Sequence, residues 1–385
     1  MLEKLRYLTA GESHGKGLLG IIDGLPSKLE ISEDYIRYQL SRRQKGHGRS
    51  NRMKIESDFA ELYCGVRQGR TNGGPIGLII KNRDYKNWSE CMSVEKNDYS
   101  KKVTLPRPGH ADLAGVMKFG FDDIRDVIER SSARETAMRV AISSVCRKML
   151  EDLNIEFCSR VVQIHNIVDN TQINFSKSLS KINNLIDQSD VRCLDEKSES
   201  AMINAIDSAK KNGDSVGGVI EIYCTGLPFG LGSYTQWDRK LQSKISESLL
   251  SINAFKGIEF GMGFNAAENL GSDVHDEIAI DNKKLTRKTN NAGGIEGGMS
   301  NAQPLIIRVS MKPIPTLTKP LDSVDIQSNT PNKAHRERTD SCAVPAASII
   351  AENLLCVVIA DTLLSKFGGD SMDQLKNHIK QSGKF

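Results

Sequence analysis

The sequence lacks the cysteine spacings that bind metals or exchange disulfides. Its eight cysteines are scattered over 385 residues, and no two of them form a Cys-x-x-Cys pair. This pattern gives no indication of a zinc site or a redox dithiol. No signal-peptide pattern leads the chain, so we expect a reducing, cytoplasmic location and free thiols.

Long hydrophobic runs and strong charge are also absent. The longest apolar run near the C-terminus, Leu354 to Ala360, is far shorter than the roughly 20 residues that span a bilayer. The formal net charge of +4 is too small to indicate nucleic-acid binding. We therefore expect neither a membrane nor a nucleic acid as a partner.

The common nucleotide-binding motifs are missing or incomplete. No G-x-x-x-x-G-K-[ST] sequence occurs, so a P-loop is not supported. The stretch "GMGFNA" at residues 261–266 fits the pattern G-x-G-x-x-A, but the residues after it become polar and contain a glycine. That is too short for the helix of a βαβ unit, so a Rossmann domain is not expected.

The composition that remains is that of a globular protein with mixed helices and strands. Hydrophobic residues make up 38% of the chain and charged residues 26%, with no internal repeat or low-complexity linker. Helices and strands intermix without a regular βαβ rhythm, which favours an α+β fold. The patterns predict strands at 74–82, 217–227 and 304–313, and helices at 135–150, 199–211, 243–252 and from 344 to 367.

Two short stretches place a histidine in a glycine-containing turn. "AGESHGKG" at residues 10–17 combines a carboxylate, a hydroxyl, His14 and three glycines. Glycines allow a backbone to bend tightly near a ligand, and a histidine held there can donate a proton near neutral pH. An ordinary turn with a solvated histidine is the alternative. "RPGHAD" at residues 107–112 holds Arg107 and His110 in a similar turn.

The stretch "ERSSARETAMRVA" indicates an anion site. Arg130, Ser131 and Ser132 lie where a helix is predicted to begin, and the free N–H groups of a helix start bind anions. The alternative is a purely structural capping box formed by Ser132 and Glu135.

Three further segments could contact a ligand. "SRRQKGHGRSNRMK" places six basic side chains in what we expect to be one loop, and "NNAGGIEGGMSN" could bring a backbone close to a flat ring. "RERTDSCAVPAA" places Asp340 just before the last helix, where a helix-cap role is the alternative. Together with the histidines, these segments indicate a polyanionic ligand handled by acid–base chemistry.

In this order and spacing, the chain resembles the chorismate synthase family over nearly its whole length. The resemblance is carried by "GESHGKGLLGIIDGLP", "RPGHAD", "RSSARETAMRVA", "NNAGGIEGGMSN" and "RTDSCAVPAA". It implies one catalytic domain over residues 1–385, folded as a β-α-β sandwich with helices between two antiparallel sheets, and a homotetramer. It also implies conversion of 5-enolpyruvylshikimate 3-phosphate to chorismate and phosphate by 1,4-anti elimination. That reaction needs reduced FMN without net redox change; whether NADPH reduces the flavin on the same chain stays open.

The resemblance also implies roles for individual residues. His14 and His110 would be the catalytic histidines, with roles that could be exchanged, and Asp340 would lie near the flavin ring. Arg43, Arg49, Arg107 and Arg134 would bind the substrate or a nicotinamide phosphate. The FMN contacts would be Arg130, Ser131, Ser132, Asn253, Ala254, Gly297, Lys312, Pro313, Ile314, Pro315, Thr316 and Arg338.

The chain departs from the family pattern in two places. Many members have three arginines and a proline where this chain has Arg42, Arg43, Gln44 and Lys45. This leaves open which side chain clamps the phosphate. Lys28 replaces a common glycine.

Two other functions are consistent with parts of the sequence. A flavin-dependent oxidoreductase would consume stoichiometric reductant, whereas a lyase would release phosphate without doing so. A basic protein that binds RNA or phosphorylated ligands would need aromatic stacking platforms, and residues 40–56 contain no Phe, Tyr or Trp.

Overall fold

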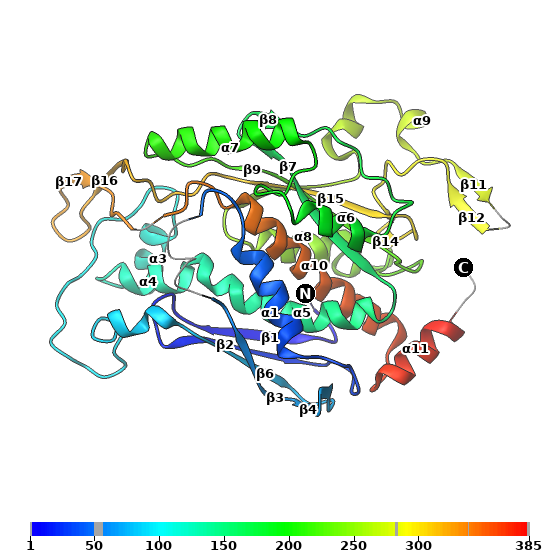
Figure 1. Cartoon of the computed structure of the whole chain (residues 1–385), viewed down its shortest axis with the longest axis horizontal. Coiled ribbons are helices and arrows are strands. Elements are labelled where there is room, and N and C mark those ends of the chain that lie inside the picture. The colour runs from blue at the N-terminus through cyan, green and yellow to red at the C-terminus, as the bar shows by residue number, and fades with distance from the viewer. Residues whose placement is uncertain (1, 50–56, 282–283, 338, 383–385) are drawn as a thin grey trace.

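The computed structural model describes residues 2–49, 57–281, 284–337 and 339–382, and its larger sheets are both antiparallel (Figure 1). The first has four strands in the order β1-β2-β6-β3. Along β2, Leu18 and Ile22 are buried while Leu19 and Ile21 are exposed, so one face is covered and the other is not. Its strands are β1 (Arg6–Gly11), β2 (Gly17–Asp23), β6 (Ile76–Lys81) and β3 (Ala60–Cys64).

The second sheet has five strands in the order β10-β15-β9-β7-β8. Strand β15 alternates buried and half-buried residues, whereas β7 is buried along most of its length. The strands are β10 (Phe255–Phe260), β15 (Leu305–Met311), β9 (Gly218–Thr225), β7 (Glu156–Ile164) and β8 (Ile167–Val168).

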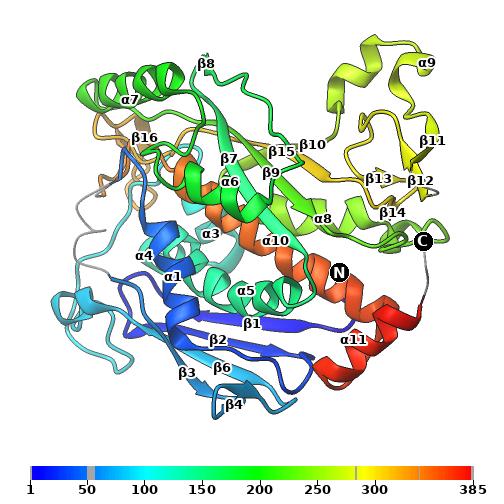
Figure 2. The ribbon, with the colours of Figure 1, turned by 45° about the vertical axis from the view of Figure 1, so that its right-hand side comes forward.

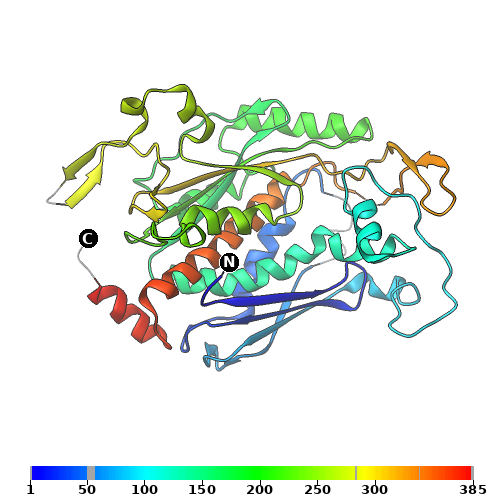
Figure 3. The same ribbon diagram turned by 180° about the vertical axis from the view of Figure 1, so that it is seen from behind.

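Helices α5 (Thr136–Glu151) and α10 (Val344–Phe367) lie between the two sheets (Figure 2). Helix α5 packs on β2 and β6, α10 packs on β7 and β9, and the two helices pack on each other. Gly20 allows the close approach of α5, because an added Cβ there would lie 2.5 Å from the sulfur of Met138. The view from behind shows the same layers (Figure 3). Beside them lie α1 (Glu33–Gln44) and α8 (Leu241–Leu250).

Helix α10 carries apolar residues on all its faces, as expected of a helix at the centre of a core, with a few buried polar side chains among them. By length and composition it could cross a membrane, but its most apolar 18-residue stretch is completely buried inside the protein. One cluster of buried hydrophobic side chains runs through both sheets and includes Ile22, Met138, Leu354 and Ile222. The hydrophobicity of α10 is therefore explained by its place in the core.

Apart from the 16-residue helix α7, the remaining elements are short. The helices are η1 (Arg83–Asn87), α3 (Asp112–Phe119), α4 (Arg125–Ser131), η2 (Ala133–Glu135), α6 (Leu179–Ile186), α7 (Glu196–Lys211), η3 (Trp237–Arg239), η4 (Gly263–Glu268), α9 (Gly271–Val274) and α11 (Met372–Gln381). The strands are β4 (Val66–Arg67), β5 (Arg70–Thr71), β11 (Ile278–Asp281), β12 (Lys284–Arg287), β13 (Ile295–Glu296), β14 (Met299–Ser300), β16 (Asp322–Val324) and β17 (Pro331–Lys333).

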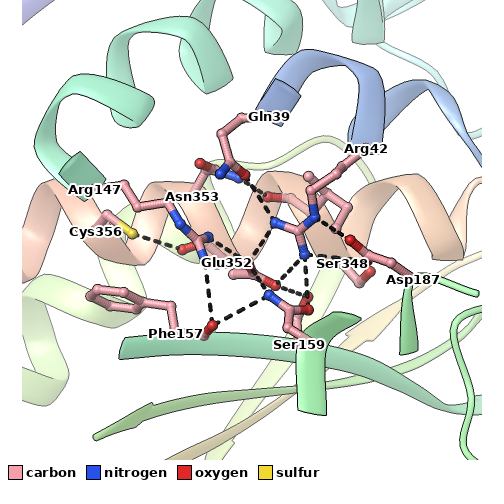
Figure 4. Close-up of polar contacts among 12 residues, drawn as sticks. Gln39, Arg42, Arg147, Phe157, Ser159, Asp187, Ser348, Glu352, Asn353 and Cys356 are labelled. Atoms are coloured by element: carbon pink, nitrogen blue, oxygen red, sulfur yellow. Dashed lines mark hydrogen bonds and ion pairs between the residues drawn. The ribbon is translucent and has the colours of Figure 1, made fainter. Parts of the chain in front are cut away.

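A buried ionic cluster ties α1 to α10. Glu352 on α10 is fully buried and accepts hydrogen bonds from the guanidinium of Arg42 at 2.9 Å and from Arg147 (Figure 4). Ser159 Oγ donates to its other oxygen at 2.6 Å. Burial alone would raise the pKa of Glu352, but the arginines around it, Arg192 included, hold this pKa well below its usual range.

The α+β class and the predicted elements are confirmed, with small shifts at their ends. Residues 261–266 belong to no long helix, in agreement with the absence of a Rossmann unit. The prediction that Arg42 and Arg43 lie in a loop is wrong, because both occupy the last turn of α1 and are buried. Residues 50–56 lie outside the described residues, so Arg52 and Lys54 of that stretch are not placed.

The helix start predicted at residues 130–132 is confirmed only for Ser132, which caps the short turn η2, and is wrong for Arg130 and Ser131. Helix α4 ends at Ser131, the short turn η2 follows, and α5 begins only at Thr136. The capping box does not form: Ser132 Oγ accepts from the backbone N–H of Arg134, while Glu135 accepts from the hydroxyl of Thr9 at 2.9 Å. A different arrangement must therefore account for any anion site here.

Candidate active site

A cavity of about 370 Å³ lies at the C-terminal end of α4, beside the start of α10. Segments far apart in the sequence meet there: the β1–β2 loop, residues 107–111, residues 311–316 and the segment leading into α10. Of the residues predicted from the sequence, the lining includes His14, Arg43, Arg49, Arg107, His110, Ser131, Ser132, Arg134, Asn253, Ala254, Lys312, Ile314, Pro315, Thr316 and Asp340.

Three predicted contacts do not line this cavity. Arg130 donates instead to the backbone oxygens of Thr9 at 2.8 Å and Gly11 at 3.2 Å, so it holds the end of β1. Pro313 lies between lining residues without being one of them. Gly297 forms the turn of the β13–β14 hairpin, which lies at the opposite end of the molecule from α4 (Figures 1 and 2). Arg338 lies outside the described residues.

The glycine-rich stretch around that hairpin serves the protein's own packing. An added Cβ at Gly293 would lie 2.3 Å from the backbone nitrogen of Gly261, and one at Gly298 would lie 2.8 Å from the backbone oxygen of Ser233. In this stretch the glycines allow the backbone to lie close to other backbone segments of the same chain, whereas the sequence had predicted a close approach to a flat ring.

The loop that carries His14 is a tight, well-anchored turn. Gly11 has a φ of +106°, and an added Cβ would lie 2.3 Å from the backbone oxygen of Gly17, so only glycine fits. The side-chain amide of Asn82 donates to the backbone oxygens of Glu12 at 3.0 Å and Gly15 at 2.9 Å. The histidine is therefore presented by a fixed loop, and the solvated turn considered above is wrong, since His14 is only 6% exposed.

The ring of His14 has a carboxylate on one side and an aromatic face against it. Its Nδ1 lies 2.9 Å from Oε1 of Glu129, and the ring stacks on Trp88 with centroids 4.0 Å apart. Because Nδ1 is engaged, Nε2 is the ring nitrogen left to serve a ligand.

His110 has an equivalent carboxylate partner. Its Nδ1 lies 2.6 Å from Oδ1 of the fully buried Asp112. Arg107 donates to both oxygens of that carboxylate and, at 2.9 Å, to Oγ1 of Thr316. Burial alone would raise the pKa of Asp112, but the hydrogen bonds from His110 and Arg107 lower it far below its usual range, so the carboxylate stays ionised.

A wall of arginines lines the side nearest α5. Arg43 donates to Oγ1 of Thr136 at 2.9 Å, and Arg43 and Arg134 both pair with the buried carboxylate of Asp58. Burial and the positive charges of Arg49 and Arg134 lower the pKa of Arg43 to about 10, although Asp58 opposes the shift. Arg43 therefore remains protonated at neutral pH, available to a bound anion.

Asp340 faces this wall and is not a helix cap. One of its carboxylate oxygens lies 3.0 Å from the guanidinium of Arg49. The residue preceding α10 is Ala343, and no side chain of the described residues caps that helix start. The alternative role considered for Asp340, capping, is therefore wrong.

Other lining residues have features that suit a planar, phosphorylated cofactor. The Oγ of Ser131 is buried and has no hydrogen-bond partner in the described part of the chain, so it is available to a ligand oxygen. Asn253 donates to the backbone oxygen of Ser131 at 2.9 Å, and Ala254 holds a left-handed φ of +68° beside it. The apolar surface comes from Ile128, Ile252, Met311, Ala346, Ala347 and Ile350.

The sequence interpretation missed several residues of the site. Ser13 and Glu337 line the cavity and lie inside stretches already singled out, but nothing in the sequence gave them a role. Glu129 and Asn82 contact the His14 loop from positions 115 and about 70 residues away, so only the folded chain shows them. Among the described residues, no group of three or more His, Cys, Asp or Glu could hold a metal ion.

The chain is similar to known proteins over almost all of its length. Residues 5–364 match the model of the chorismate synthase family. A chorismate synthase of Listeria welshimeri is 50% identical over 382 residues, with 98% of each chain covered. One of Bacillus pumilus is 49% identical over 384 residues, again with 98% of each chain covered.

The fold is similar as well. A crystal structure described as that of chorismate synthase superposes on this chain with a TM-score of 0.80 at 38% sequence identity. The superposition covers 99% of this chain and 98% of that one.

Proposed function

The chain belongs to the chorismate synthase family, and from that premise we propose which residues of its cavity carry out the family's reaction. The enzyme is a carbon–oxygen lyase of aromatic biosynthesis. It eliminates phosphate and a ring hydrogen from opposite faces of 5-enolpyruvylshikimate 3-phosphate to give chorismate, without net oxidation or reduction.

The substrate carries three anionic groups, one phosphate and two carboxylates. The observation that carries our proposal is the concentration of Arg43, Arg49, Arg107 and Arg134 on a cavity that also holds both histidines. Guanidinium groups match carboxylate and phosphate oxygens in pairs, and partial burial strengthens that attraction. These arginines would bind the substrate and orient it across the cavity.

We infer that reduced FMN occupies the side of the cavity near Ser131. The unpartnered hydroxyl of Ser131, the nearby Asn253 and Ala254, and Lys312 with Thr316 supply polar contacts, and the apolar surface between them suits a flat ring. Bound there, reduced FMN would supply reversible electron donation to the substrate, so that no net redox change results.

The protein's own contribution is binding, exclusion of water and proton control. His14, with Nδ1 held by Glu129, would donate a proton from Nε2 to the departing phosphate. His110, whose Nδ1 is held in the same way by Asp112, would keep the reduced flavin in its productive protonation state. Asp340 would help move the ring hydrogen away. The contacts do not distinguish the two histidine roles, which could be exchanged.

We further propose that the chain is one catalytic domain and forms a homotetramer. The continuous core supports the single domain, and the two sheets around α5 and α10 support the β-α-β sandwich expected of the family. Leu8, Leu19 and Ile21 are exposed on the uncovered face of the four-stranded sheet, as suits a surface that meets other copies.

The proposal is tested by anaerobic turnover of 5-enolpyruvylshikimate 3-phosphate with photoreduced FMN. We expect chorismate and phosphate to form together, and essentially neither to form with oxidised FMN. Equal rates with oxidised and reduced FMN would contradict the proposal. A parallel reaction with oxidised FMN and NADPH reports whether the chain reduces its own flavin.

A further inference from the structure

The geometry points to Glu129 as the residue that positions His14 for proton transfer. We infer that it fixes both the backbone and the ring of His14, so that Nε2 faces the bound phosphate. The inference rests on the proton-donor role proposed above for His14. Glu129 itself is a positioning residue, since it does not line the cavity.

Glu129 holds the histidine loop at three points. One carboxylate oxygen accepts the backbone N–H of His14 at 2.7 Å, and the other lies 2.9 Å from Nδ1 of the ring. The backbone oxygen of Glu129 accepts the N–H of Ser13 at 3.0 Å. Because one side chain grips the main chain and the ring together, the ring cannot rotate without losing a buried hydrogen bond.

Trp88 and Arg125 complete the support. The His14 and Trp88 rings are stacked at 25° to each other, which fixes the plane of the imidazole. The guanidinium of Arg125 lies 5.2 Å from the Trp88 ring centroid and 3.3 Å from Oε1 of Glu129. Burial raises the pKa of Glu129, but its contacts with His14 and Arg125 outweigh this and lower it, so Glu129 is ionised at neutral pH.

The same support reaches a second segment of the cavity lining. Arg125 also pairs with Glu337 at 2.9 Å, and Glu337 lines the cavity three residues before Asp340. The carboxylate that holds His14 is thereby linked through Arg125 to the segment that carries Asp340. Loss of Glu129 would release one end of this link.

His110 provides independent support for the inference. Its Nδ1 is held by Asp112, which is likewise buried, ionised and backed by an arginine. The chain thus builds the same arrangement twice, on the two histidines that share one cavity. A carboxylate on Nδ1 selects which nitrogen carries the proton toward the ligand.

The first test is Glu129→Gln, measured with reduced FMN under anaerobic conditions. An amide keeps the shape but presents an NH₂ group to one of the two N–H donors of His14, so it cannot hold both. We expect kcat to fall by about 10–10²-fold, as on loss of other supporting carboxylates, with KM and the affinity for FMN nearly unchanged. Glu135→Gln is the matched control: this carboxylate contacts the Thr9 hydroxyl, and we expect wild-type kcat.

The second test combines Glu129→Gln with His14→Ala. If Glu129 acts through His14, adding Glu129→Gln to His14→Ala should change kcat less than about twofold. A further tenfold loss in that background, or wild-type kcat for Glu129→Gln alone, would overturn the positioning role. Wild-type kcat for His14→Ala would instead overturn the role proposed for His14.

Glu129→Asp keeps the inference testable if Glu129→Gln fails to fold. The shorter carboxylate can reach only one of the two donors, so we expect an intermediate kcat at unchanged KM. A structural role alone would lower the yield of folded enzyme while each folded site kept its wild-type kcat, and that result would also overturn the inference.

Discussion

At the scale of single residues, each side chain assigned to the chemistry has a charged partner, buried or half-buried, that holds it in place. His14 rests on Glu129, His110 on Asp112 and Asp340 on Arg49. Such second contacts are what keep reacting groups within small fractions of an ångström of a productive position. Substitutions at these residues should therefore separate chemistry from folding.

Replacing either histidine with alanine should slow turnover by about 10²–10⁴-fold, the usual contribution of a positioned proton donor. Both histidines lie in loops, so folding and substrate binding should survive. Phosphate release in a single turnover, with binding measured separately, checks this. Loss of soluble protein, with normal rates in the remainder, would show that the histidines are structural.

Asp340→Asn should bind FMN normally but lose most of its turnover, by about 10²-fold, because asparagine cannot accept a proton at neutral pH. The start of α10 carries no side-chain cap, so thermal stability should stay close to wild type for both Asp340→Asn and Asp340→Ala. An unimpaired single turnover of Asp340→Asn with reduced FMN would remove Asp340 from the mechanism.

The acid stability of the protein should depend on Glu337. Burial raises the pKa of Glu337, but His335 and Arg125 outweigh burial and lower it to about 2. A carboxyl with a depressed folded pKa adds stability at neutral pH that is lost as the pH falls from about 4.5 toward 2. In urea titrations over that range, wild type should lose stability more steeply than Glu337→Gln. If the stability of both proteins fell equally with pH, the contacts of Glu337 with Arg125 and His335 would not stabilise the protein.

At the scale of elements, the neighbours Arg42 and Arg43 show what a sequence pattern cannot supply. They are adjacent on α1, yet Arg42 points to Glu352 in the core while Arg43 lines the cavity. The sequence predicted a basic segment, but a charge pattern does not say which side chain points into the core and which into the cavity. The long helix α10, by contrast, was predictable because a largely apolar stretch begins with Pro345 and ends at Gly368.

Lys28 shows how a departure from a family pattern gains a physical meaning. The family resemblance predicts a glycine at this position, and the φ of +64° of Lys28 lies in the left-handed region that favours glycine. Its ammonium pairs with Asp373 at 2.8 Å on the surface. The requirement at this position therefore concerns the backbone conformation, and Lys28 does not line the cavity.

The buried cluster around Glu352 should be a major source of stability. Replacing Glu352 with Gln leaves Arg42, Arg147 and Arg192 without their shared carboxylate, and breaking a buried pair typically costs about 3–5 kcal/mol. The midpoint of urea unfolding should fall accordingly. Glu30→Gln is the control, because its pair with Arg70 is exposed and screened by solvent, so the midpoint should stay close to that of wild type. Equal effects of the two substitutions would contradict this reading of the cluster.

At the scale of the whole molecule, the cavity is assembled by the packing of the two sheets around α5 and α10. The motifs carrying His14, His110 and Asp340 could be found in the sequence because each is a compact stretch of unusual composition. The residues that support them could not be found in this way, because Glu129 and Trp88 contact His14 only in the folded chain. Gly297, which was predicted to contact the same cofactor as the cavity residues, lies at the far end of the molecule. Local patterns name candidate residues, whereas long-range packing decides which of them meet.

The central claim is that this cavity eliminates phosphate without net consumption of reductant. The most direct measurement is the ratio of phosphate released to reduced FMN consumed, under anaerobic conditions with substrate in large excess over flavin. The account predicts that phosphate far exceeds the flavin present and that the flavin is still reduced when the substrate is exhausted. Phosphate release that stops at one equivalent per flavin, with the flavin oxidised, would contradict it and identify a reductase instead.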